Sequence, residues 1–294
     1  MVRLRKPMAV PAPSRQKLQK HLQHSLQVAW GLYCRRFKQC RRKFSESSVH
    51  QLRVATRRLL ALLEVLSEIT GEDAVEPPRR LLKKWLRRFA RLRDTQVQLP
   101  LIDESLRIFP EARTVRSALL RRERKLTRRL AERVRGARPR GLEAAMAGFR
   151  SELRRCLRRE SWTEEHWSAL VRAIELAFAE VNHWRGRSGH GQPLALHRMR
   201  IAFKKFRYGV EALQPVLHRV PRRQLAAMNE FQTRLGDIQD SHVMLGTLAE
   251  FCRKNPKAAV ALRALRRDVK QRRDTQVRAF IATAGQMNEF WPPR

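Results

Sequence analysis

The chain has 294 residues, with 64 Lys and Arg against 27 Asp and Glu, which gives a formal net charge of +37 at pH 7. Because solvated protein surfaces normally carry both signs, this excess indicates a polyanionic partner: nucleic acid, polyphosphate or an anionic membrane surface. Apolar residues make up 43% of the chain, which is enough for a folded core and excludes a disordered basic tail.

The sequence predicts helices throughout, because Leu, Arg and Ala are abundant and no run alternates apolar and polar residues with a period of two. In chain order we expect helices over residues 14–43, 48–71, 77–99 and 110–136, a basic break at 137–141, a bridging helix over 142–159, and further helices over 161–184, from 193, from 221, and over 255–285. The most loop-like stretch is Arg185–Gln192.

Local sequence signals set these boundaries. Ser48 with Gln51, and Ser161 with Glu164, match the capping-box pattern at a helix start. Gly71 is a typical helix stop. Prolines are tolerated in a first helical turn, where a missing N–H costs nothing, and we expect this role for Pro77, Pro78, Pro110, Pro193, Pro221 and Pro256.

Two segments of the chain carry nearly the same sequence. VHQLRVATRRLLALLEVL begins at Val49 and LHRMRIAFKKFRYGVEAL begins at Leu196, so that His50 corresponds to His197, 147 residues later. Further along, RFARLRDTQVQL (88–99) aligns with RLGDIQDSHVML (234–245). We therefore predict one domain over residues 1–294, with a first repeat at about 14–136, the bridging helix at about 142–159 and a second repeat at about 161–285.

The matching positions form a basic stripe on each repeated helix. At about 100° per residue, the stripe residues fall within an arc of about 60–80°, and Leu, Met, Phe and Val lie on the opposite face. The stripes comprise His50, Arg53, Arg57 and Glu64 in the first copy, and His197, Arg200, Lys204, Tyr208 and Glu211 in the second, with Arg207 beside them. Arg can grip phosphate oxygens with two donors, whereas we expect the two glutamates to hold neighbouring basic side chains.

With these residues the chain resembles the CHAD domain family, the conserved histidine α-helical domains. The resemblance rests on VHQLRVATRRL, on LHRMRIAFKKFRYGVEAL, and on the LRD (92–94) and LGDIQD (235–240) segments, and it covers almost the whole chain. It implies an all-α fold of two four-helix bundle units related by a pseudo-twofold axis, with a basic groove or pore between them. It also implies binding of inorganic polyphosphate and association with polyphosphate granules. Some members are fused to a CYTH triphosphatase domain, which this sequence lacks.

Carried over residue by residue, the resemblance implies a set of polyphosphate contacts. These are His50, Arg53, Arg57, Arg58, His197, Arg200, Lys204, Lys205 and Arg207. The first copy departs from the motif at Leu60 and Ala61, where the second has Arg207 and Tyr208, so we expect fewer contacts from the first copy at this level. Further candidate contacts are Arg88, Arg93, Arg121, Lys125, Arg128, Tyr208, Arg266, Lys270 and Arg273.

Nucleic-acid binding is the main alternative function. The net charge would suit it, but RNA-binding modules stack bases on exposed aromatic rings, and the aromatic residues here, such as Phe203 and Phe206, mostly occupy apolar helical positions. Polyphosphate has no bases and needs no such platform.

A metal-dependent phosphohydrolase is a weaker alternative. Asp237 and Asp240 have a spacing that could bind Mg²⁺, but Arg91 stands where the first copy would need the equivalent of Asp237. His21 and His24 share a helix face without a third ligand nearby. Because known catalytic motifs are also absent from the sequence, we expect no enzymatic activity, no metal and no cofactor.

The remaining features concern the cellular context. Cys34, Cys40, Cys156 and Cys252 form no CxxC pair, so we expect reduced thiols. The sequence shows no secretory signal and no apolar run of the roughly 20 residues that a membrane helix needs, so we expect a cytoplasmic protein without a membrane partner. The oligomeric state is left open.

Overall fold

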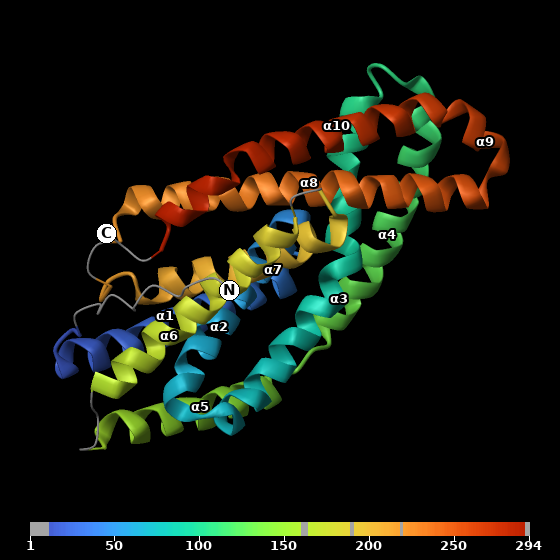
Figure 1. The fold of residues 1–294 in the computed structure, drawn as a ribbon. Coiled ribbons are helices and arrows are strands. Elements are labelled where there is room, and N and C mark those ends of the chain that lie inside the picture. The colour runs from blue at the N-terminus through green and yellow to red at the C-terminus, as the bar shows by residue number, and fades with distance from the viewer. Residues whose placement is uncertain (1–11, 160–163, 189–190, 218–219, 292–294) are drawn as a thin grey trace.

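The computed structural model describes residues 12–159, 164–188, 191–217 and 220–291, and every regular element in these ranges is a helix (Figure 1). The elements are α1 (Arg15–Arg42), α2 (Glu46–Thr70), α3 (Glu72–Ser105), the short 3₁₀ helix η1 (Pro110–Ala112), α4 (Arg113–Arg135), α5 (Arg140–Arg158), α6 (Glu164–Arg187), α7 (Pro193–Leu213), α8 (Arg222–Lys254), α9 (Pro256–Ala261), α10 (Arg263–Thr283) and the 3₁₀ helix η2 (Ala284–Glu289). The all-α fold class is therefore confirmed.

The capping box of α2 lies one turn earlier than predicted. Ser45 is the N-cap: its hydroxyl accepts a hydrogen bond from the Ser48 backbone N–H at 3.2 Å, and the Ser48 hydroxyl accepts one from the Ser45 N–H at 2.9 Å. A serine hydroxyl thus takes the role that Glu or Gln usually fills. Gln51 instead donates to the Ser47 hydroxyl at 3.3 Å. The second predicted box, which begins at Ser161, lies outside the described residues.

The start of α3 was also wrongly predicted. The helix begins at Glu72, and Pro77 and Pro78 lie inside it. A helical proline cannot bond to the carbonyl four residues earlier, and its ring crowds that carbonyl; for Pro77 and Pro78 these carbonyls belong to Asp73 and Ala74, in the first turn of the helix. Gly71 adopts φ +81°, a backbone conformation that favours glycine, and so α2 passes into α3 without a loop.

Two boundaries in the second half also differ from the prediction. The expected last helix is divided, because the backbone leaves helical geometry at Leu262, between α9 and α10. The Leu262 side chain is fully buried. At the other end of this half, α6 continues to Arg187, into the stretch predicted as a loop.

The long helices form two extended pairs. In the first half of the chain α3 packs against α4, and in the second half α8 packs against α10. Figure 1 shows the α8–α10 pair crossing the far end of the α3–α4 pair, and α3 contacts α8 there. The two helices that carry the repeated sequence, α2 and α7, also pack against each other.

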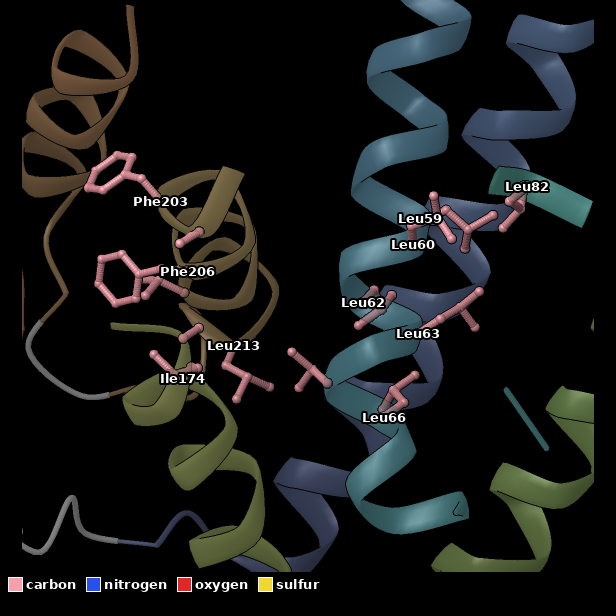
Figure 2. Packing of buried hydrophobic residues seen from close by; sticks show 14 of the residues in the cluster. Leu59, Leu60, Leu62, Leu63, Leu66, Leu82, Ile174, Phe203, Phe206 and Leu213 are labelled. Atoms are coloured by element: carbon pink, nitrogen blue, oxygen red, sulfur yellow. The ribbon is translucent and has the colours of Figure 1, made fainter. Parts of the chain in front are cut away.

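One apolar cluster spans both halves of the chain. It includes Leu59, Leu63 and Leu66 of α2 together with Phe203 and Phe206 of α7, all of which are fully buried (Figure 2). The burial of each such side chain contributes about 1.5–3 kcal/mol, so this cluster fixes the orientation of α2 and of α7 in the fold. The expectation that Phe203 and Phe206 belong to the core is confirmed.

A second, smaller apolar cluster joins the far ends of the two helix pairs. Its members include Ile102 of α3, Leu119 of α4, Met244 of α8 and Leu265 of α10. Along α3 the first cluster extends to Leu92, and the second contains Ile102. Along α8 the first cluster extends to Ile238, and the second contains Met244. The intervening stretches carry polar side chains, and they are the part of the fold on which the candidate site is built.

Candidate functional site

Helix α2 directs three basic side chains towards the boundary between the two apolar clusters. Arg53 is only 6% exposed, and its Nη1 donates to the backbone carbonyl of Leu86 at 2.9 Å. Arg57, one turn later, is half-buried, whereas His50 is exposed at the start of the helix. The opposite face of α2 is buried in the first apolar cluster, and this burial fixes the direction in which the basic face of the helix points.

Helix α7 presents the equivalent side chains from the second half. His197 is half-buried, and its Nδ1 donates to Oε1 of Gln239 on α8 at 2.7 Å. Arg200 and Lys204 are half-buried as well. The Arg200 Nε is buried and has no hydrogen-bond partner within the described part of the chain, as is also true of the Nε of Arg207 and of Arg234.

Two further helices complete this arrangement. Arg93 of α3 is a quarter exposed, and its Nη1 donates to the Glu46 carboxylate at the start of α2 at 2.8 Å. Asp94 of α3 and Asp240 of α8 are aligned residues of the two copies, and both act electrostatically on Arg200. We call the six basic residues the central basic cluster: His50, Arg53, Arg57, Arg93, Arg200 and Lys204.

The basic residues of the two halves lie close enough to shift each other's pKa. Burial, and then the charges of Arg200 and Arg57, lower the pKa of Lys204 to about 6, although Asp240 opposes this. Burial and the charge of Arg57 lower the pKa of Arg53 to about 10. Lys204 and Arg200 come from α7, whereas Arg53 and Arg57 come from α2, so the two stripes predicted from the sequence act on one another.

Three further basic residues of the cluster also have a lowered pKa. Burial is the largest cause of the lowered pKa of Arg57, Arg200 and His50, and neighbouring arginines lower each pKa further. Burial raises the pKa of Asp240, an effect that Arg200 and Lys204 partly offset. The cluster thus holds more positive charge in a poorly solvated place than its two carboxylates neutralise, and it would favour an anion of high charge density.

Arg58 and Lys205, which follow the stripe residues in each copy, project into solvent. Arg58 Nε lies 3.7 Å from the Glu211 carboxylate of α7, an ion pair between the two halves. Glu64 is 3.5 Å from both Arg79 and Lys83. The expectation that the two glutamates hold neighbouring basic side chains is therefore confirmed.

Arg207 has partners inside the protein. It is 6% exposed, and its Nη1 donates to Asn229 at 2.7 Å and lies 3.2 Å from the Glu211 carboxylate. Its guanidinium also lies 4.7 Å from the centre of the Tyr208 ring. Arg207 thus anchors α7 to α8 from within, while Tyr208, itself 8% exposed, acts electrostatically on Arg57 and Arg200.

Arg88 lies over the ring of Trp85, with 4.9 Å between the guanidinium carbon and the ring centre. The aligned residues of the second copy, Arg234 and Phe231, form the same cation–π pair at 5.6 Å. These pairs are repeated structural contacts on α3 and α8.

The structure does not bring the candidates on α4 and α10 together. Arg121 lines a cleft between α4 and the end of α8, Arg128 lines a different cleft against α1, and Lys125 is exposed beside them. Arg266 and Lys270 are exposed on α10, and Arg273 donates to its neighbour Asp274 at 2.9 Å.

Gln239 was missed from the sequence. Gln239 is the position of the second copy that aligns with Arg93 of the first. Because its side chain is neutral, the basic pattern did not indicate its contact with His197. His21, considered above as a metal ligand, instead contacts the backbone: its Nε2 lies 2.8 Å from the Ala212 carbonyl oxygen. No group of three His, Cys, Asp or Glu side chains suited to a metal ion occurs within the described ranges.

The comparison with protein families decides the assignment. The family model of the CHAD domain matches residues 32–249. The chain belongs to the CHAD domain family. Its fold is similar to that of a solved CHAD domain, from the plant Ricinus communis, with a TM-score of 0.65 and 18% identity over 90% of this chain and 92% of that chain.

The comparison with curated proteins gave no match. The matched range of this CHAD chain holds the central basic cluster in full, from His50 on α2 to Lys204 on α7. Among the described helices, none is long and apolar enough to cross a membrane.

Proposed function

We propose that this CHAD protein binds inorganic polyphosphate at the central basic cluster. The observation that carries the proposal is the convergence of Arg53 and Arg57 from one repeat with Arg200 and Lys204 from the other, all in a partly desolvated place. Burial, and after it the charge of neighbouring arginines, lowers the pKa of Arg53 and of Lys204, and a polyanion would relieve this electrostatic repulsion.

The chemistry of the cluster suits phosphate oxygens. Arginine offers planar pairs of N–H donors, and the Arg200 Nε has no partner in the described structure. Lys204 adds a compact charge that becomes fully protonated next to an anion. Successive phosphates along a chain would neutralise side chains from both repeats at once, in a basic groove or pore between them.

A linear polyphosphate fits these features better than nucleic acid does. Phe203 and Phe206 are fully buried, so they offer no stacking platform for bases. Charge alone would still give weak, non-specific binding of nucleic acid. We further propose that the protein acts by binding, without catalysis, in the cytoplasm at polyphosphate granules, as the family resemblance implies.

The test is a competition titration of long-chain polyphosphate against single-stranded RNA and DNA at physiological salt. We expect polyphosphate to displace both nucleic acids at equal phosphate concentration. Stronger binding of either nucleic acid would contradict the proposal.

The double variant Arg200→Ala with Lys204→Ala tests the position of the site. A matched control is Arg263→Ala with Arg267→Ala on α10, which removes two exposed basic residues with the same spacing. We expect only the first variant to lose most of its affinity for polyphosphate. Equal affinity of the two variants would place the binding site elsewhere.

A further inference from the structure

A second concentration of arginines lies outside the central basic cluster, on the surface between α1 and α4. Arg41 and Arg42, at the end of α1, face Arg124, Arg128 and Arg135 of α4 across a cleft of about 520 Å³. We call it the outer cleft. Arg124, Arg128 and Arg135 fall within an arc of about 40° on α4, and so they form one continuous basic edge.

The outer cleft continues into a neighbouring hollow of about 480 Å³. The two share Arg41 and Arg135, and the second adds Arg138 and Arg140 from the break before α5 and its first turn. This run of arginines extends for the length of several helical turns, which suits a chain-like ligand better than a small one.

The charges of the outer cleft are not balanced. Glu123 is the one carboxylate among its lining residues, and it accepts a hydrogen bond from Thr127 at 3.1 Å. None of the lining arginines forms an ion pair with another residue in the described part of the chain. Elsewhere on the protein, Arg79, Arg116 and Arg155 do have carboxylate partners.

The outer cleft approaches the central basic cluster at one point. Its floor includes Phe44, whose ring packs against Phe89 of α3 with 6.4 Å between the ring centres. One turn further along α3, about 6 Å along the axis, Arg93 pairs with Glu46, which lies only two residues after Phe44. The two basic regions are therefore linked through Phe44, in the connection between α1 and α2, and through the neighbouring turns of α3.

We propose that the outer cleft binds the segment of a polyphosphate chain that extends beyond the central basic cluster. The inference rests on the proposed function, because it requires a polyphosphate chain to occupy the central basic cluster first. Repeated phosphates with no side groups can follow a path from one arginine set to the next, and each added contact slows dissociation of the same chain.

The test uses two variants of α4 with the same change in charge and the same spacing. Arg124→Gln with Arg128→Gln removes two arginines of the outer cleft, and Arg129→Gln with Arg133→Gln removes two exposed arginines from another face of α4. Glutamine keeps the helix propensity close to that of arginine, so both variants should fold.

Affinity is measured for long-chain polyphosphate and for tripolyphosphate, which is too short to reach both regions. We expect the outer-cleft variant to lose about tenfold in affinity for the long chain and to keep its affinity for tripolyphosphate. The dependence of the long-chain binding constant on salt should weaken by a slope of about 1.4, or about 0.7 for each lost phosphate contact. The control variant should lose no more than about twofold.

Equal losses in the two α4 variants would overturn the proposal, because they would reflect net charge alone. An equal loss for tripolyphosphate and the long chain in the outer-cleft variant would also overturn it, because the outer cleft would then be the primary site. Failure of the proposed function has a different signature: the Arg200→Ala and Lys204→Ala double variant would bind tripolyphosphate as the wild type does.

Discussion

Arg93 of α3 and Gln239 of α8 are aligned residues of the two copies, and they act on the repeated histidines in different ways. The charge of Arg93, after burial, lowers the pKa of His50. Gln239 instead accepts a hydrogen bond from Nδ1 of His197 at 2.7 Å. The first copy therefore contributes to the cluster a basic residue that the second lacks.

Arg93→Gln makes the first copy resemble the second at this position. We expect the pKa of His50 to rise, because one of the arginines that lower it is removed, and polyphosphate affinity to fall by about three- to tenfold. NMR titration of the histidine ring and a binding titration measure the two effects. Arg91→Gln, an exposed position on the same helix, is the control, and an unchanged His50 titration in Arg93→Gln would contradict the prediction.

Lys204 should make the free energy of unfolding depend on pH. Its pKa is about 6 in the folded protein and about 10.4 in an unfolded chain, so between these values the unfolded state binds more protons. Stability should therefore increase as the pH rises from about 6 towards 10. Lys204→Met should be more stable than the wild type at pH 6.5, and this difference should shrink at pH 9, as measured by urea unfolding at both values.

Binding of polyphosphate should take up a proton at neutral pH. A bound polyanion favours the charged form of Lys204 and raises its pKa, so affinity should fall as the pH rises above about 6. Calorimetry in two buffers of different ionisation enthalpy counts the protons. The Lys204→Met variant should show a smaller uptake, and equal uptake in the two proteins would assign the proton to another group.

Arg207→Ala should affect stability more than ligand binding. The substitution leaves Asn229 and Glu211 without their buried partner, which should cost about 2–4 kcal/mol of unfolding free energy. Lys205→Ala, next to it but exposed, should change stability by less than about 0.5 kcal/mol. Urea unfolding distinguishes the two, and similar values would show that the contacts of Arg207 contribute little.

Polyphosphate should raise the melting temperature of the protein. A ligand that binds only the folded state at about 100 times its Kd adds about 2.7 kcal/mol of stability, and here it also neutralises the repulsion among Arg53, Arg57 and Arg200. Thermal unfolding with and without polyphosphate measures the shift. The Arg200→Ala and Lys204→Ala double variant should show a much smaller one.

The helices and the basic stripes could be predicted because both follow from periodicity within one segment. Leu59 and Phe206 are buried where the pattern places them, and Arg53 and Arg200 lie on the opposite faces. The start of α3 could not be predicted, because proline is tolerated in the first turns of a helix as well as at its beginning. The pseudo-twofold relation of the two repeats stays a prediction.

The parts of the site that depend on contacts between helices distant in the sequence could not be predicted. Arg207 belongs to the family motif, but its burial depends on Asn229 of α8, which no local pattern connects to it. Arg93 and Arg128 were both candidate contacts on amphipathic helices, yet one joins the central basic cluster and the other lines the outer cleft. The two arginines differ in role because α3 packs against α2 and α8, whereas α4 packs against α1.

The two apolar clusters, on either side of the polar stretches of α3 and α8, hold the two repeats together at both ends of their interface. Separating the repeats would expose leucines and phenylalanines at both ends of the interface in a single step, and this would be far slower than the exchange of a bound anion. If polyphosphate binds between the repeats as proposed, long chains should enter and leave lengthwise without separation of the repeats. Their exchange rate would then depend on the number of free chain ends in solution.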